Sequence, residues 1–134
     1  MARRLALLGL VALVAAGCGV RNSKAFEPKP SAACLRKHGF AHVTTDPRQI
    51  GFVAAFADRG GLKATSPTGN VLTIAFADDP SSTPNEEQAF RLHAPPRLRP
   101  HLSDIMSSSR NAVLVWTITP RSDEVDTVNR CLSS

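Results

Sequence analysis

Four histidines and two adjacent aspartates are the residues of this chain that could bind a metal ion or move protons. His38 and His42 are four residues apart, the spacing that places two metal ligands on one face of a helix. Gly39, however, is expected to end the helix between them. Three prolines separate His93 from His101, and neither pair lies in an HExxH pattern. We therefore expect four solvated surface histidines and no metal site.

Asp78 and Asp79 follow an apolar, β-prone run, a position at which catalytic or calcium-binding carboxylates occur. Pro80 and a serine-rich loop come next, and the following acidic residue is Glu86. No serine lies in a GxSxG or SxxK pattern, so the sequence does not support nucleophilic hydrolysis. A small hydrolase or a metal-handling protein with its site near Asp78 and Asp79 remains an alternative. The favoured interpretation is a solvated strand end that leads into a helix cap.

Cysteine is the third residue type that could carry chemistry, and the residues before Cys18 are the most informative. Arg3 and Arg4 precede twelve apolar residues (5–16), which are typical of an export signal. Twelve residues are too few to span a bilayer. The small residues at 15–17 directly before Cys18 resemble the lipobox of bacterial lipoproteins. That resemblance implies a signal peptide at 1–17, which is removed, and a diacylglyceryl group on Cys18.

The lipobox resemblance also implies a location. Two acyl chains on Cys18 give stable attachment to membrane lipid. The polar, proline-containing stretch that follows is expected to be flexible, so residues 18–30 form the lipidated cysteine and its tether. The protein is then expected at the extracytoplasmic face of the cell membrane, on the periplasmic or extracellular side. An ordinary secretory signal, which would leave Cys18 as a free thiol or a dimer link, is the alternative, and the export route (Sec or twin-arginine) stays open.

With Cys18 assigned to lipid, Cys34 and Cys131 remain, and two leftover cysteines in an exported protein favour a disulfide. The bond would close a loop of about 98 residues, for which chain entropy gives about 4 to 5 kcal/mol of stability. Two buried free thiols are the alternative. Neither cysteine lies in a CxxC pair, the usual spacing for thiol-redox catalysis and for structural zinc.

The elements that position these residues follow from capping signals and apolar periodicity. Ser31 and Gly39 bound a first helix, and Asp46-Pro47 is a start signal for a second one that Gly60-Gly61 ends. The run at 71–77 is apolar on both faces, so it is expected to be a central strand. The full prediction is helices at 31–37, 47–59, 83–92, 101–106 and 121–132, and strands at 40–45, 62–66, 71–77 and 111–119.

Without the outer helices, the order of these elements is β-α-β-β-α-β, which predicts an α+β fold. We expect the ferredoxin-like arrangement, a four-stranded antiparallel sheet backed by two helices, with extra N- and C-terminal helices. Its first and last strands are neighbours, which would bring the helices that carry Cys34 and Cys131 to the same end of the sheet. The arrangement also places the very apolar strand at 111–119 on an edge, where an exposed face favours aggregation.

Composition bounds the remaining choices. Without residues 1–17, the chain has a single domain at 31–134, and 14 basic against 11 acidic side chains give a net charge of +3. The net charge is small and the basic residues are spread along the chain, which argues against a nucleic-acid-binding surface, where clustered lysines and arginines are expected. Trp116 is the only tryptophan and tyrosine is absent, so few side chains are available to stack on bases or sugars. We expect Trp116 in the core.

The anchor together with the missing catalytic motifs predicts a non-catalytic protein. The arginine-rich, lysine-poor chain is similar to the small lipoproteins of unknown function that are common in actinobacteria, and this resemblance supplies no activity and no cofactor. We expect a membrane-anchored binding or cell-envelope accessory module whose ligand the sequence does not identify. A structural subunit of an envelope complex, with an envelope protein as partner, is the second alternative.

Overall fold

The structure is a computed structural model that describes residues 24–133, so the predicted signal peptide (1–17) and Cys18 lie outside the described residues. Its helices are α1 (Pro28–Lys37), α2 (Phe52–Phe56), α3 (Thr83–His93), α4 (Leu102–Ile105) and α5 (Ser122–Cys131), with a 3-10 turn, η1 (Arg99–His101), before α4. Its strands are β1 (Ala41–Thr44), β2 (Gly61–Thr65), β3 (Val71–Phe76), β4 (Met106–Ser109) and β5 (Ala112–Trp116). No helix of this described part is long and apolar enough to cross a membrane.

The strands form one antiparallel sheet in the order β1-β2-β3-β5-β4. The α+β class is therefore correct, but the ferredoxin-like arrangement is wrong. In that arrangement the first strand would pair with the strand at 111–119, whereas β1 lies at one edge and pairs with β2. Strand β3 is central, as its apolar sequence predicts, because β2 and β5 pair with its two sides.

Strand β4 explains why the apolar strand at 111–119 is not at an edge of the sheet, where the ferredoxin-like arrangement would place it. Residues 106–109, a methionine and three serines, were expected to end a helix, but they pair residue for residue with β5. Arg110, at a positive φ of 50°, and Asn111 form the tight turn between the two strands. Because β4 occupies the edge, the apolar β5 is an interior strand, and a short polar strand faces solvent instead.

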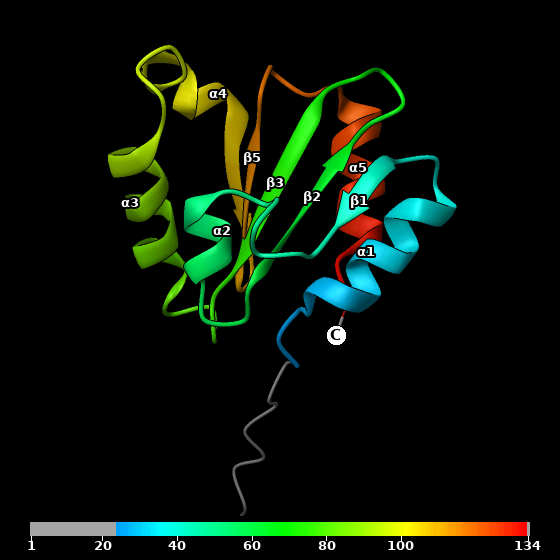
Figure 1. Cartoon of the computed structure of the whole chain (residues 1–134), viewed down its shortest axis with the longest axis horizontal. Coiled ribbons are helices and arrows are strands. Elements are labelled where there is room, and N and C mark those ends of the chain that lie inside the picture. Colours follow the sequence, from blue (N-terminus) through cyan, green and yellow to red (C-terminus); the bar gives the residue numbers. More distant parts are fainter. Residues whose placement is uncertain (1–23, 134) are drawn as a thin grey trace, which may run out of the picture.

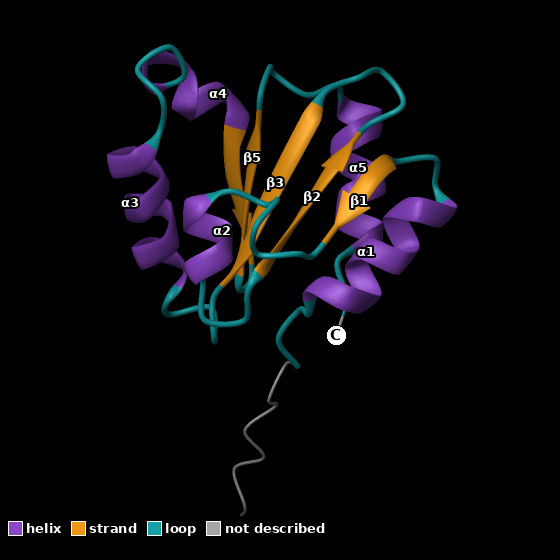
Figure 2. Cartoon of the chain, in the orientation of Figure 1, coloured by secondary structure: helices purple, strands orange, loops and turns teal. Residues whose placement is uncertain are grey.

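Alternate residues along β3 contact two different helical layers. Leu72 and Ile74 belong to the larger core, with α1 and α5, whereas Ala75 packs against Ile50 and Ala54 beside α2. Figures 1 and 2 show the result: α1 and α5 cover one face of the sheet, and α2 and α3 lie over the other.

The second helix is much shorter than the predicted span of 47–59. The Asp46 side chain accepts a hydrogen bond from the Arg48 backbone N–H (3.0 Å), and the Gln49 N–H is donated to the Asp46 carbonyl (2.9 Å). These contacts close a separate turn instead of capping a helix. Gly51 then has a φ of 88°, a left-handed conformation that interrupts a helix. Only Phe52–Phe56 is helical.

The folded domain begins before residue 31, so the predicted tether (18–30) is too long at its C-terminal end. Helix α1 begins at Pro28 and not at Ser31. The Phe26 backbone N–H donates to the side chain of the buried Asn111 (2.8 Å), and the Glu27 N–H donates to the Ser133 carbonyl (2.8 Å). Residues 26–30 are therefore part of the folded domain.

Glu124 is a buried acid that joins α5 to the turn between β2 and β3. Glu124 is 5% exposed. Its carboxylate accepts hydrogen bonds from the hydroxyls of Ser66 and Thr68 and from the backbone N–H of Arg121 (2.8 Å). Burial on its own would raise the pKa of Glu124. The hydrogen bonds from the Ser66 and Thr68 hydroxyls and the Arg121 N–H outweigh burial and hold that pKa below its ordinary value.

We expect Glu124→Gln to cost stability at neutral pH and to cost less at acidic pH. Because the pKa of Glu124 is lower in the folded than in the unfolded chain, its charged form contributes fully above the unfolded pKa, about 4.3. The contribution is lost as the pH falls through the folded pKa. Urea unfolding at pH 7 and pH 3 should show the gap in unfolding free energy between wild type and variant narrowing with acid. An equal gap at both pH values would refute this assignment.

Candidate functional site

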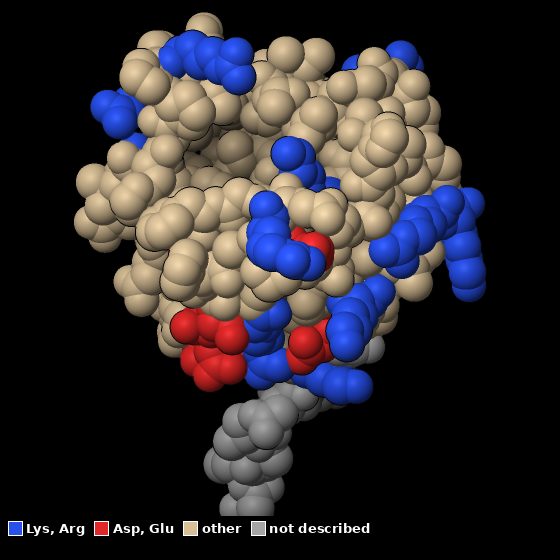
Figure 3. Space-filling view, viewed as in Figure 1, with Lys and Arg blue, Asp and Glu red and all other residues tan. Residues whose placement is uncertain are grey.

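A cavity of about 320 Å³ opens between the sheet and the layer formed by α2 and α3. Its floor is the sheet face that carries Thr73, Val115 and Thr117, and Figure 3 shows the hollow on the molecular surface. Two chain segments form the walls: the start of α2 on one side, and the end of α3 with the chain that follows it on the other. The wall residues are Ile50, Gly51, Phe52, Val53, Ala54, Phe90, His93, Ala94, Pro95, Leu98 and Leu102, and Trp116 also lines the cavity.

Local sequence explains why this face of the sheet stays open. Helix α2 has only five residues, so it covers a small part of the sheet. Pro95 and Pro96 prevent α3 from continuing, because proline lacks the backbone N–H and clashes with the preceding turn. The chain then returns toward the sheet through Leu98 and Leu102, which close the cavity at its far side. The hollow is thus framed by the late start of α2 and by the end of α3.

The lining is suited to apolar groups. Among the described residues that line it, there is no aspartate, glutamate, lysine, arginine, serine or cysteine. The lining residues whose side chains have polar atoms are Thr73, Thr117, His93 and Trp116, and the side chain of Trp116 belongs to the larger core. Its titratable side chain is a single histidine, His93, and the lining matches the mostly apolar sites that bind small molecules.

Two large apolar side chains stand exposed at the margin of the cavity. Phe52, which lines it, is 62% exposed, and its neighbour Phe56 is 77% exposed. The Phe52 ring lies between the Phe56 ring (centroids 4.9 Å apart) and the His93 ring (5.0 Å). Single exposed apolar residues are ordinary, but a group of them beside a cavity is typical of a contact surface.

Trp116 has the buried position that the sequence predicts, at 1% exposure. Its indole N–H has no hydrogen-bond acceptor among the described residues. A buried donor without an acceptor is uncommon in native structures. Trp116 is the only tryptophan. It pairs with Leu72, so its side chain belongs to the larger core, but it borders the cavity between the floor residues Val115 and Thr117, and its fluorescence is a reporter next to this site.

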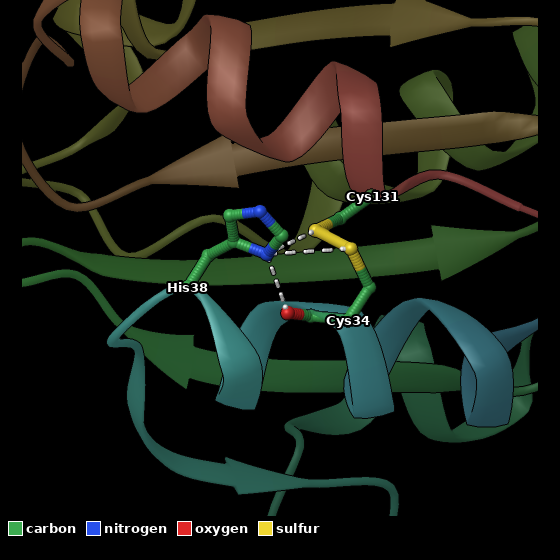
Figure 4. Close-up of side chains that lie close together, drawn as sticks. All are labelled: Cys34, His38 and Cys131. Carbon is green, nitrogen blue, oxygen red and sulfur yellow. Dashed lines mark hydrogen bonds between the residues drawn. A yellow bond between two sulfur atoms is a disulfide. The ribbon is translucent and has the colours of Figure 1, made fainter.

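The second place where reactive side chains meet is the contact between α1 and α5 (Figure 4). Cys34 of α1 and Cys131 of α5 are joined as a disulfide, with an Sγ–Sγ distance of 2.07 Å and a Cα–Cα distance of 5.3 Å. His38 Nδ1 lies 3.6 Å from both sulfur atoms and 3.0 Å from the Cys34 carbonyl oxygen. The reason that we expected for this meeting is wrong: the two helices lie side by side on one face of the sheet, although β1 and β5 are not neighbours.

Within the described residues, Cys34, His38 and Cys131 are the one group of three side chains close enough to share a metal ion. The two sulfur atoms are bonded to each other and do not offer thiolates in this state. Both cysteines lie in the last turns of their helices, where the negative end of the helix dipole disfavours a thiolate. Reactive cysteines prefer the opposite, electropositive surroundings. This geometry favours a structural cross-link.

The two aspartates singled out by the sequence make local contacts. Asp78 Oδ1 pairs with Arg59 (3.3 Å). Asp79 accepts the backbone N–H groups of Ser81 (2.7 Å) and Ser82 (3.1 Å), and the hydrogen bonds from Ser81 lower the pKa of the Asp79 carboxyl. Neither aspartate belongs to a group of three potential metal ligands in the described part of the chain. Both are solvated, as a strand end that leads into a helix requires.

The histidines are divided between the two places. His38 lies beside the disulfide, and His93 lines the cavity. His42 is on β1, so it does not share a helical face with His38, and His101 is exposed in η1. All four are exposed, which agrees with the expectation from the sequence.

Comparison of the chain with known proteins finds no matching family model, no matching curated protein and no matching solved structure. The chemistry of the site is therefore interpreted from its own geometry.

Proposed function

We propose that this protein is a non-catalytic, membrane-tethered binding domain whose cavity between α2 and α3 takes an apolar ligand. The observation that carries the proposal is the cavity itself. Its volume of about 320 Å³ falls within the range of small-molecule sites, about 300 to 1,000 Å³, and its lining is apolar. The exposed rings of Phe52 and Phe56 at its margin extend the apolar surface outward.

The tether in this proposal is a diacylglyceryl group on Cys18, with residues 1–17 removed. Because the domain already holds Phe26, the link consists of residues 19–25. Seven extended residues reach about 23 Å, so the domain would work close to the outer face of the cytoplasmic membrane. This short reach suits a protein that exchanges an apolar ligand with the bilayer.

The binding proposal is tested by titrating the mature chain, residues 18–134, with dodecan-1-ol. This chain carries Cys18→Ser, so that it has no acyl chains of its own to compete with dodecan-1-ol for the cavity. Filling of the cavity should change the Trp116 emission in a saturable way with one site per chain, and hexane-1,6-diol should have no effect at the same concentrations. An emission that stays constant up to the solubility limit of dodecan-1-ol would overturn the proposal.

The anchor has its own test, the intact mass of the protein extracted from its native membranes. We expect residues 1–17 to be absent and Cys18 to carry acyl chains, because the small residues at 15–17 resemble a lipobox. The variant Cys18→Ala should move from the membrane to the soluble fraction, whereas Ser23→Ala should not. A mature product with an unmodified Cys18 would exclude the lipid anchor and leave the binding proposal in place.

A further inference from the structure

The chain that walls the cavity on the α3 side is strongly basic. Between Glu87 and Asp104 there is no acidic residue, whereas this stretch contains three arginines and two histidines. These basic residues are Arg91, His93, Arg97, Arg99 and His101, and all five are exposed. The same stretch supplies Phe90, Ala94, Leu98 and Leu102 to the cavity, so apolar and basic side chains alternate along one wall.

None of the three arginines of this wall has a carboxylate partner among the described residues, a feature that they share with Arg36, Arg110 and Arg130. Arg48, Arg59 and Arg121 each form an ion pair with an aspartate or a glutamate. Among the described residues, no ion pair involves Arg91, Arg97 or Arg99.

Arg99 nevertheless has a structural contact, because its Nε–H donates to the Ala94 carbonyl (3.0 Å) and holds the turn after α3. Figure 3 shows basic atoms above and to the left of the hollow, whereas the acidic atoms on this side lie below it. Within residues 24–133, no acidic side chain pairs with the three arginines of this margin.

A cavity that accepts hydrocarbon, beside cations without counter-charges, is complementary to a molecule with an apolar chain and an acidic head. Building on the proposed function, we propose that the ligand is a single-chain anionic amphiphile. Its hydrocarbon chain occupies the cavity, and its carboxylate or phosphate head lies against the Arg97 and Arg99 side. The cavity volume is at the lower end of the ligand-site range, which favours one chain over two.

The test compares heads at constant chain length. The mature Cys18→Ser chain is titrated with laurate, dodecyl phosphate, dodecan-1-ol and dodecyltrimethylammonium, each below its critical micelle concentration, with Trp116 emission as the readout. We expect the two anions to bind about tenfold more tightly than the alcohol and the cation to bind most weakly. We expect the anionic head to form about one exposed ion pair with each of Arg97 and Arg99, and each pair raises the affinity by up to about fivefold. Raising the salt concentration should reduce the advantage of the anions.

Variants locate the effect. Arg97→Gln with Arg99→Gln should abolish the preference for anions. The preference is taken as the ratio of the affinities for laurate and dodecan-1-ol in the same variant, so that any effect on the cavity of losing the contact between Arg99 and Ala94 cancels. Arg97→Gln alone keeps the Arg99 contact to Ala94, so it should lose about half of the preference, as a free energy, without disturbing the turn. Arg36→Gln with Arg130→Gln, on α1 and α5 at the other face of the sheet, is the matched control and should bind as the parent chain does.

The outcomes separate this inference from the proposed function. Tighter binding of laurate points to a free fatty acid, and tighter binding of dodecyl phosphate points to a single-chain lipid with a phosphate head; both support the inference. Equal affinities for the alcohol and the anions, or an anion preference that survives the double arginine variant, would overturn it while the binding function stands. If dodecan-1-ol does not bind at all, the proposed function fails first.

Discussion

Replacing Thr73 by phenylalanine should abolish binding of the apolar ligand while the domain remains folded. Thr73 is half-buried on β3 and forms part of the cavity floor. A phenyl ring there would occupy space that the ligand needs, and phenylalanine is a favourable residue in a strand. We expect the affinity for dodecan-1-ol to fall by at least about tenfold, equivalent to about 1.4 kcal/mol. Trp116 fluorescence titration of both proteins measures this change.

The control for this variant is Thr65→Phe. Thr65 is also half-buried and lies on β2, and alternation places it on the same sheet face as Thr73, but it does not line the cavity. This second variant introduces the same ring and should bind as wild type does. Equal loss in both variants would indicate a general disturbance of the sheet, and normal binding by Thr73→Phe would place the ligand elsewhere.

Removing the cross-link between α1 and α5 should produce the largest loss of stability in the chain. Cys34 and Cys131 are 97 positions apart, and closing a loop of that length contributes about 4 to 5 kcal/mol in the chain-entropy model. Small domains have about 5 to 15 kcal/mol in total. Urea unfolding of Cys34→Ser with Cys131→Ser, compared with wild type, should show this difference as a lower transition midpoint.

Two controls accompany the double serine variant. Wild type in a dithiol reductant should match the variant, because reduction removes the same bond. Denatured, non-reduced wild type should take up no alkylating reagent at Cys34 or Cys131. Thiols at those positions in non-reduced protein, or a variant as stable as wild type, would show that the two cysteines do not act as a cross-link.

Local patterns predicted most elements of this fold, and pairing between distant segments was where prediction failed. Strands β2, β3 and β5 lie within one residue of their predicted starts, because apolar and β-branched residues fit a pleated, buried surface. Strand β4 has three serines in four residues, so its own composition does not favour a strand. It exists because the tight turn at Arg110 and Asn111 places it against the exposed edge of β5.

The strand order depended on that missing strand. With four strands, the order of elements along the chain matches a ferredoxin-like sheet. The fifth strand, β4, forms a hairpin with β5, and the sheet then pairs strands that are close together in the chain. The cysteines meet in the structure because α1 and α5 cover the same face, a relation that spacing alone does not contain. The sequence identified which cysteines to pair and gave an incorrect reason for their proximity.

The cavity was not predicted, because no single motif encodes it. It results from where one helix starts and another ends: Gly51 delays the start of α2, and Pro95 with Pro96 stops α3. The signal that was present is the stretch from Arg91 to His101, where prolines, leucines and unpaired basic residues occur together. Only the fold shows that its apolar side chains face the open part of the sheet.

The central claim is that an apolar ligand occupies the cavity between α2 and α3, and residue-resolved NMR during titration with dodecan-1-ol tests it most directly. We predict shifted backbone amide signals for residues 50–54, 93–94, 97–98 and 115–117. Signals of residues 34–38 and 124–131, around the disulfide on the opposite face, should stay in place. Shifts confined to the opposite face, or no shifts at saturating dodecan-1-ol, would contradict the account.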